Sequence, residues 1–397
     1  MSKWLENLPS GTALAAITVP CSCQLHWQVV VMGMEHGLEY TGHISLVSAL
    51  SLVAVVTIHE CGHVLAALVA GFRLSQITIG PCQLVREGRR LRPRLNRSLG
   101  RPVAFVQAAP INDRNLRRRV ALYVSGGILA NVVTGAACLL LAEWLNRVTQ
   151  PPDIPRQPAA WRTVALLMPR SLGVASLNVA AILTLGVALQ NLVPVQRRGH
   201  ASDGTKLLDL LSTGPRAERR LLPLTLTAAL LRGERPKAWK PDEVERLLAL
   251  RDGSAYDGSA NLFAYYYFVD TGQIERAGQF VDLFVAQLAD CPAGHESSLF
   301  LEAAYFVGFH RRDPVQARAW LIKSAGGQVE KQTRLRAEAA VLLAEGRCEE
   351  AAAVALQGLA AAPESADPGG AIAEAEWLEN ILTAAKQQGP KQHPFRA

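Results

Sequence analysis

The chain has 397 residues, a formal net charge of +7 and 49% hydrophobic residues, and only 19% of its residues are charged. Soluble proteins rarely combine so little charge with apolar runs long enough to cross a bilayer, so the composition argues against an ordinary soluble or disordered protein. The seven cysteines are scattered, so the sequence indicates neither a disulfide framework nor a paired-cysteine zinc site. The basic residues flank apolar segments without interleaved aromatics, so they indicate membrane topology and no nucleic-acid partner.

Apolar runs predict about four membrane spans. A weak first span covers Trp27 to about Tyr40 and carries Glu35, His36 and Glu39. Three stronger candidates follow, each near the length of the hydrocarbon core: Ile44 to Gly71, Val120 to Leu145 and Leu172 to Val195. Residues 1–10 lack the apolar core of a removable signal peptide. We therefore expect a multi-pass helical bundle.

The charges of the connecting segments predict how the helical bundle is oriented in the membrane. Residues 73–119 contain twelve arginines against Glu87 and Asp113, which makes this segment cytoplasmic by the positive-inside rule. Arg197, Arg198 and Lys206 follow the last span on the same side, and the opposite loop, 146–171, is less basic. We expect an integral protein of a bacterial cytoplasmic membrane, with its N-terminus and its C-terminal domain in the cytoplasm.

A short β-element is predicted after the first strong span. The segment Arg73 to Val85 alternates between apolar and polar residues and contains a Gly-Pro break. It is typical of a strand at the membrane edge, where a substrate could pair with it in extended form. The alternative is a simple connecting hairpin.

The remainder of the chain predicts a second domain. Residues 1–214 form the expected membrane domain, and residues 215–397 are Ala-rich with apolar residues at helical spacing. Three turn residues, Gly272, Arg312 and Gly346, are each followed five positions later by alanine. The last two repeats are offset by the tetratricopeptide period, so we predict a degenerate tetratricopeptide-like helical repeat. A generic helical bundle is the alternative, and either way the chain is mostly α.

The first strong span contains the motif His59-Glu60-Cys61-Gly62-His63. Residues four apart lie on one helix face, so both imidazoles can ligate one zinc ion while Glu60 serves as general base towards a bound water. Zinc lowers the pKa of that water and polarises a scissile carbonyl, which predicts peptide hydrolysis. Charged or polar residues are costly inside a span, so a functional site is the favoured interpretation.

A catalytic zinc site needs a third protein ligand from elsewhere in the chain. After Asn191-Leu192-Val193-Pro194, the sequence places His200 and Asp203 close together. Asp203 is our first choice because a carboxylate suits zinc and Gly204 permits a tight turn beside the metal. His200 is the alternative, since an imidazole would serve as well.

These segments together resemble the site-2 protease family of intramembrane zinc metalloproteases, over roughly Pro20 to Leu211. The His59 to His63 motif lies within a span, and Gly126 to Asn131 is similar to the family's G-P-x-x-N element, with Ile128 in place of proline. Asn191 to Pro194 followed by Asp203-Gly204 is similar to its N-L-x-P…D-G segment.

The resemblance implies a zinc cofactor held by His59, His63 and Asp203, with Glu60 as the general base. It implies that Asn131 and Asn191 position the substrate backbone. The expected function is cleavage of transmembrane or membrane-associated proteins or peptides near the cytoplasmic face, in regulated proteolysis or peptide maturation. The helical domain is expected to bind a protein partner. A membrane scaffold without proteolytic activity is the alternative, which the intact Glu60 disfavours, and a tethered soluble zinc protease conflicts with a motif inside an apolar run.

Overall fold

The computed structural model describes residues 42–43, 45–88, 90–95, 104–148, 172–197, 200–254, 256–288, 296–325 and 329–388. The predicted weak span from Trp27 to Tyr40 lies outside these residues. The chain divides into two compact units. The first comprises residues 1–83, 94–108 and 117–211, and the second comprises residues 84–93, 109–116 and 212–397.

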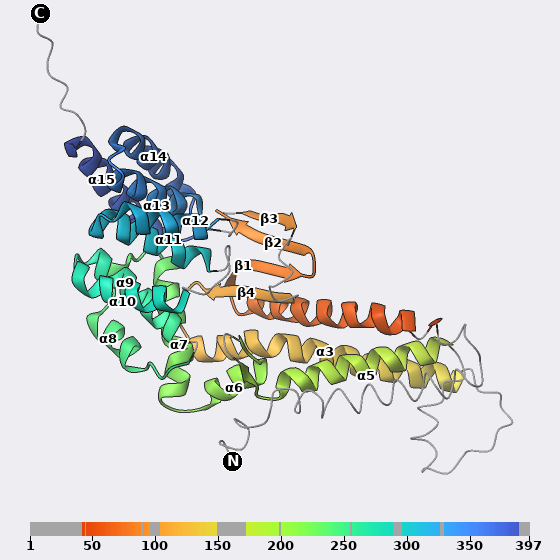
Figure 1. Ribbon diagram of the computed structural model, residues 1–397. Helices are drawn as coiled ribbons and strands as arrows, with labels where there is room; N and C mark the ends of the chain where they lie inside the picture. The colour runs from red at the N-terminus through yellow and green to blue at the C-terminus, as the bar shows by residue number, and fades with distance from the viewer. Residues whose placement is uncertain are drawn as a thin grey trace, which may run out of the picture. The chain divides into compact units, whose positions relative to one another are not determined.

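Three helices in the described part of the chain are long and apolar enough to span a membrane, close to the three stronger predicted spans. They are Ser45–Val69, called the motif helix below, α3 (Leu116–Val148) and α5 (Leu172–Leu192). Large apolar side chains such as Leu65, Leu68 and Val69 are exposed on the motif helix, as a lipid-facing surface requires. The three helices run alongside one another in the first unit (Figure 1).

Small residues allow these helices to approach closely. A Cβ atom on Gly62 of the motif helix would lie 2.4 Å from the carbonyl oxygen of Gly126 in α3, and a Cβ on Gly126 would lie 2.5 Å from the carbonyl oxygen of Gly62. Ala66 and Ala130 border the same contact. Such small-residue contacts are a usual means of helix association in membranes, where lipid removes the hydrophobic driving force between helices.

The end of the motif helix is held by α3. Gly71 has a φ of 66°, the left-handed conformation that commonly terminates a helix. Arg119 donates to the carbonyl oxygens of Ala70 (2.6 Å) and Gly71 (3.1 Å), and its guanidinium lies over the Phe72 ring. In the sequence the arginines of residues 73–119 indicated only a cytoplasmic location, whereas the structure shows that Arg119 also caps the preceding helix.

The segment after the motif helix forms a four-stranded sheet, which is larger than the predicted β-element. Its strands are β1 (Phe72–Ile79), β2 (Cys82–Glu87), β3 (Arg90–Leu95) and β4 (Ala104–Pro110), in the order β3-β2-β1-β4. The prediction of a membrane-edge strand at Arg73 to Val85 is corrected in one respect. Because β1 and β2 are paired on both sides, the outer strands that can accept another strand are β3 and β4.

A two-stranded element connects α5 to α6. The strands β5 (Gln196–Arg197) and β6 (His200–Ala201) pair antiparallel, with Arg197 opposite His200. The helix α6 (Asp203–Leu211) follows directly. The connection that contains both candidate third ligands is therefore a short hairpin leading into a helix.

The second unit is mainly helical beyond residue 212. Its helices are α7 (Pro215–Leu231), η1 (Pro236–Ala238), α8 (Pro241–Ala249), α9 (Tyr256–Asp270), α10 (Ile274–Leu288), α11 (Ser297–Phe306), η2 (Val307–Arg311), α12 (Pro314–Lys323), α13 (Lys331–Ala344), α14 (Cys348–Ala361), η3 (Ala362–Glu364) and α15 (Pro368–Gln388). The three turn residues singled out in the sequence, at 272, 312 and 346, all have positive φ. The alanines five positions after them are fully buried. The tetratricopeptide-like assignment and the domain boundaries remain predictions.

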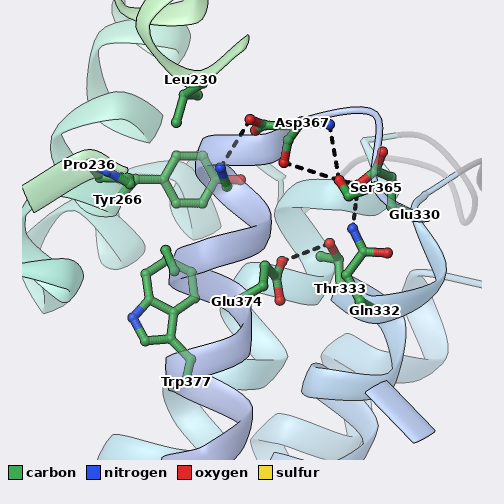
Figure 2. A pocket seen from close by; sticks show the side chains of 12 residues that line it. Leu230, Pro236, Tyr266, Glu330, Gln332, Thr333, Ser365, Asp367, Glu374 and Trp377 are labelled. Atoms are coloured by element: carbon green, nitrogen blue, oxygen red, sulfur yellow. Dashed lines mark hydrogen bonds between the residues drawn. The ribbon is translucent and has the colours of Figure 1, made fainter. Parts of the chain in front are cut away.

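The helical unit contains a pocket of about 100 Å³, lined by residues of α7, η1, α9, α13 and α15 and of the segments just before α13 and α15 (Figure 2). Its carboxylates are bonded within the chain. Glu330 accepts from Ser365 Oγ (2.5 Å) and from the backbone nitrogen of Ala366 (2.8 Å), and Glu374 accepts from Thr333 Oγ1 (2.7 Å). These bonds fix the loop before α15 onto α13.

Three ionisable groups form a buried cluster in the core of this unit. The Arg336 side chain is 0% exposed, and it pairs with Glu302 (2.7 Å) and Glu374 (2.8 Å). Its guanidinium lies over the rings of Tyr305 and Trp377, at 4.1 and 4.8 Å from their centroids. One cation therefore faces two carboxylates in a dry environment, which favours protonation of one of them.

We expect the stability of the helical unit to fall between mildly acidic and neutral pH. Burial raises the pKa of Glu374 from 4.5 to about 7; the charge of Arg336 opposes this and that of Glu302 adds to it. Because the folded state binds a proton that the unfolded chain releases, this contribution is complete below pH 4.5 and is lost as the pH rises through about 7. Thermal unfolding of the full chain in detergent, followed by circular dichroism, should show a melting temperature that falls as the pH rises over this range. Glu374→Gln should make this fall smaller, and an equal fall in both proteins would contradict the prediction.

Candidate metal centre

The motif helix places two imidazoles side by side. His59 and His63 are four residues apart, and their Nε2 atoms lie 3.2 Å from each other. Both residues are buried, with 6% and 8% of their surface exposed. The helical spacing recognised in the sequence therefore brings two nitrogen donors to one point inside the bundle.

Asp203 joins this pair from the first position of α6. Its Oδ2 atom lies 3.0 Å from Nε2 of His63 and 3.3 Å from Nε2 of His59. Ser202 caps the helix, because its Oγ accepts from the backbone nitrogen of Thr205 (3.2 Å). The cap thus fixes the start of α6, and with it the position of the Asp203 side chain.

Gly204 is required for this position of α6. A Cβ atom at residue 204 would lie 1.9 Å from the carbonyl oxygen of Leu192 and 3.1 Å from that of Asn191. The first turn of α6 therefore packs directly against the backbone at the end of α5. The sequence suggested glycine for a tight turn here, and the structure shows that the close approach of two backbones also requires it.

The charge of Asp203 is balanced on both carboxylate oxygens. Lys206, one turn later in α6, donates to Oδ1 at 2.9 Å, while Oδ2 faces the histidines. Burial alone would raise the pKa of Asp203, but hydrogen bonds with His59 and His63 and the charge of Lys206 hold it well below its usual range. The carboxylate is therefore ionised at neutral pH, as a metal ligand must be.

One face of α3 lies against the two histidines. The carbonyl oxygen of Tyr123 accepts from Nδ1 of His63 at 2.9 Å, and the Tyr123 hydroxyl donates to the carbonyl of Val106 in β4 at 2.6 Å. One turn further, a Cβ on Gly127 would lie 2.6 Å from Nε2 of His63 and 2.7 Å from Nε2 of His59. The absence of a side chain at Gly127 therefore leaves space beside both donor nitrogens.

The three donors fit a tetrahedral zinc ion. With zinc bonds of about 2.0–2.1 Å, two donors of a tetrahedral site lie about 3.3–3.4 Å apart. The three separations here are 3.0, 3.2 and 3.3 Å. Within the described residues, His59, His63 and Asp203 are the group of metal-ligating side chains whose donor atoms converge. Two imidazoles and one carboxylate are a usual catalytic zinc set, with a fourth position for water.

The other predicted site residues differ in their contacts with this cluster. Glu60 is buried, with 7% exposed, and it directly follows His59 in the motif helix. Asn131 is fully buried, and its Nδ2 lies 3.3 Å from Nδ1 of His59. Asn191 instead donates to the carbonyl of Val187 in its own helix at 3.0 Å. His200 belongs to strand β6, three residues before Asp203.

Three participants were not singled out in the sequence as parts of the site. They are the carbonyl of Tyr123, the space at Gly127 and the ammonium of Lys206. Tyr123, Gly127 and Asn131 recur every four residues, which places them on one face of α3. That spacing was visible in the sequence, but its importance depends on which helix faces α3.

Comparison with known proteins gives one family match that covers the site. Residues 47–233 match the model of peptidase family M50. This is the site-2 protease family, and the match covers just under half of the chain, including the motif helix, α3, α5 and α6. The M50 match supports an intramembrane metalloprotease, and M50 proteases are in general zinc-dependent. No curated protein and no solved structure gave a significant match.

Proposed function

We propose that this chain is a zinc-dependent intramembrane endopeptidase. The observation that carries the proposal is the convergence of two histidine nitrogens and one carboxylate oxygen, buried within the part of the chain that matches family M50. His59, His63 and Asp203 hold the metal. The substrate is a transmembrane or membrane-associated protein or peptide, cleaved near the cytoplasmic face.

The site residues have distinct roles in the proposed reaction. When bound, zinc supplies Lewis acidity that makes water nucleophilic at neutral pH and polarises a carbonyl. Glu60 accepts the proton of the attacking water and passes it to the leaving amine. Lys206 holds Oδ1 of Asp203, which leaves Oδ2 for the metal. Asn191 is proposed, from the family resemblance, to position the substrate backbone, and the same resemblance offers Asn131 for that role.

The substrate must reach this site in extended form. A helix hides its scissile carbonyls in internal hydrogen bonds, whereas a strand added to a sheet edge presents them. The outer strand β4 is bonded through Val106 to Tyr123, whose carbonyl holds His63. We propose that the substrate pairs with β4. The helical unit is proposed to recruit or regulate through a protein partner, and the cytoplasmic orientation and bacterial membrane location belong to the same proposal.

Two substitutions test the proposal directly. Glu60→Gln should keep bound zinc and lose about 10²- to 10⁴-fold in cleavage, because it removes proton transfer and leaves the ligands intact. Asp203→Ala should lose both zinc and cleavage, because it removes a ligand. Zinc is measured by elemental analysis of the purified full chain, and cleavage with a model transmembrane peptide in detergent.

Asp209→Ala provides a matched control, since Asp209 lies on the same helix α6 and outside the converging donors. It should keep both zinc and activity. Unreduced cleavage by Glu60→Gln would end the proteolytic interpretation. A non-proteolytic scaffold would bind its partners equally well with either site residue replaced, and the buried Glu60 next to three converging donors disfavours that function.

A further inference from the structure

Both histidines of the motif helix contact α3 through Nδ1, the ring nitrogen that does not point to the other donors. His63 is bonded through Nδ1 to the carbonyl of Tyr123, and His59 faces Asn131 through its own Nδ1. Tyr123 and Asn131 are eight residues apart, as two turns of one helix face require, and the histidines are one turn apart on the motif helix. The outer nitrogen of each imidazole is thus matched by a group on the same face of α3.

A metal ligand of this kind needs a defined tautomer. When Nε2 of an imidazole binds a metal, Nδ1 carries the proton and must donate it to an acceptor, which fixes the ring and increases its basicity. The carbonyl of Tyr123 serves as this acceptor for His63. His59 needs an equivalent acceptor, and the Asn131 amide is the group adjacent to its Nδ1, at 3.3 Å.

The present orientation of the Asn131 amide leaves one atom without a partner. Its Nδ2 faces His59, while its Oδ1 is buried with no hydrogen bond. A half-turn of the amide exchanges the two atoms with almost no change of shape. Turned in this way, Oδ1 accepts from the Nδ1–H of His59, which leaves Nε2 of His59 as the donor to zinc.

We infer that Asn131 is a positioning residue for the zinc ligand His59, acting as the acceptor for its Nδ1 proton. The side chain of Asn131 is 0% exposed, so it has no free surface for direct contact with a substrate. This assigns Asn131 a role different from the substrate contact implied by the family resemblance. The inference rests on the proposed function, since it takes His59 as a zinc ligand.

Zinc affinity of the full-length protein in detergent, measured by competition with a chromophoric chelator, tests this inference. Asn131→Leu and Asn131→Ala remove the acceptor and should weaken zinc binding about 10- to 100-fold, the usual effect of losing a partner of a metal-bound histidine. Asn131→Asp keeps an oxygen acceptor of the same shape and should bind zinc within a few-fold of the wild type. The visible spectrum of the Co²⁺-substituted protein should change in the first two variants and be retained in the third.

Asn191→Ala is the matched control, because its amide is bonded to its own helix at Val187 and should leave zinc affinity unchanged. Wild-type zinc affinity in Asn131→Ala, with only the KM or kcat of cleavage altered, would overturn the inference in favour of substrate contact. A loss in Asn131→Asp as large as that in Asn131→Ala would also overturn it. If the wild type itself binds no zinc, or if His59→Ala binds it equally well, the proposed function fails first.

Discussion

Alanine at position 127 is expected to leave the protein unable to hold zinc. The added Cβ atom would lie 2.6 Å from Nε2 of His63, 2.6 Å from Cε1 of His59 and 2.7 Å from Nε2 of His59. These distances are far below a normal van der Waals contact, so the methyl group would occupy the space beside both donor nitrogens. The expected result is loss of bound zinc and of all measurable cleavage, and the readouts are elemental zinc content and cleavage of a model transmembrane peptide.

Gly135→Ala is the control for a glycine replacement in the same helix. Its Cβ would lie 2.6 Å from Cγ and 2.8 Å from Cδ2 of Leu185 in α5, so the added methyl group strains the packing against α5 and does not meet the histidines. This variant should keep its zinc and lose only some stability. If Gly127→Ala elutes as a folded protein from size exclusion and still carries one zinc ion per chain, then the space beside the histidines does not serve the metal.

Removal of Arg336 is expected to produce the largest loss of stability in the helical unit. Arg336→Met leaves Glu302 and Glu374, with side chains 1% and 10% exposed, without their shared cation. Breaking a buried pair by removing one partner costs about 3–5 kcal/mol, because an uncompensated charge stays in a dry environment. The contacts of the guanidinium with Tyr305 and Trp377 are lost as well.

Hydrogen exchange of the full chain in detergent provides the measurement. Amides in α11, α13 and α15 should exchange about 10²- to 4 × 10³-fold faster in Arg336→Met than in the wild type, since each 1.4 kcal/mol is about a factor of ten. Arg318→Met is the control, because Arg318 pairs with Glu345 at a partly exposed position. Its effect should stay below about 1 kcal/mol. Equal protection in both variants would show that the buried cluster does not stabilise this unit.

Much of the membrane part was readable from the sequence. The apolar runs predicted the three described spans within a few residues, because twenty or so consecutive apolar residues have few other stable arrangements. The HExxH motif implied two imidazoles on one helix face, since its spacing equals about one turn. The match to family M50 over residues 47–233 agrees with the resemblance noted from three separate segments. The choice of Asp203 over His200 stays a prediction, although Asp203 lies beside the histidines.

Other features depended on contacts between distant segments. The sheet order places β1 in the interior and makes β3 and β4 the outer strands, which alternation within one segment cannot predict. Arg119 was one of twelve arginines that predicted the orientation of the membrane domain, yet it caps the motif helix, because α3 begins beside the end of that helix. The predicted helical unit is present, while its repeat character remains to be tested.

Residue type and helical spacing are local properties, so the candidate zinc ligands could be chosen from the amino-acid sequence. The groups that lie behind these candidate ligands became known only from the packing of the helices. Whether a tyrosine carbonyl, a missing side chain or an asparagine amide meets an imidazole depends on how two helices cross, and here the close contact of Gly62 with Gly126 sets that crossing. Helix periodicity fixes a face, but small residues on both partners fix which faces meet.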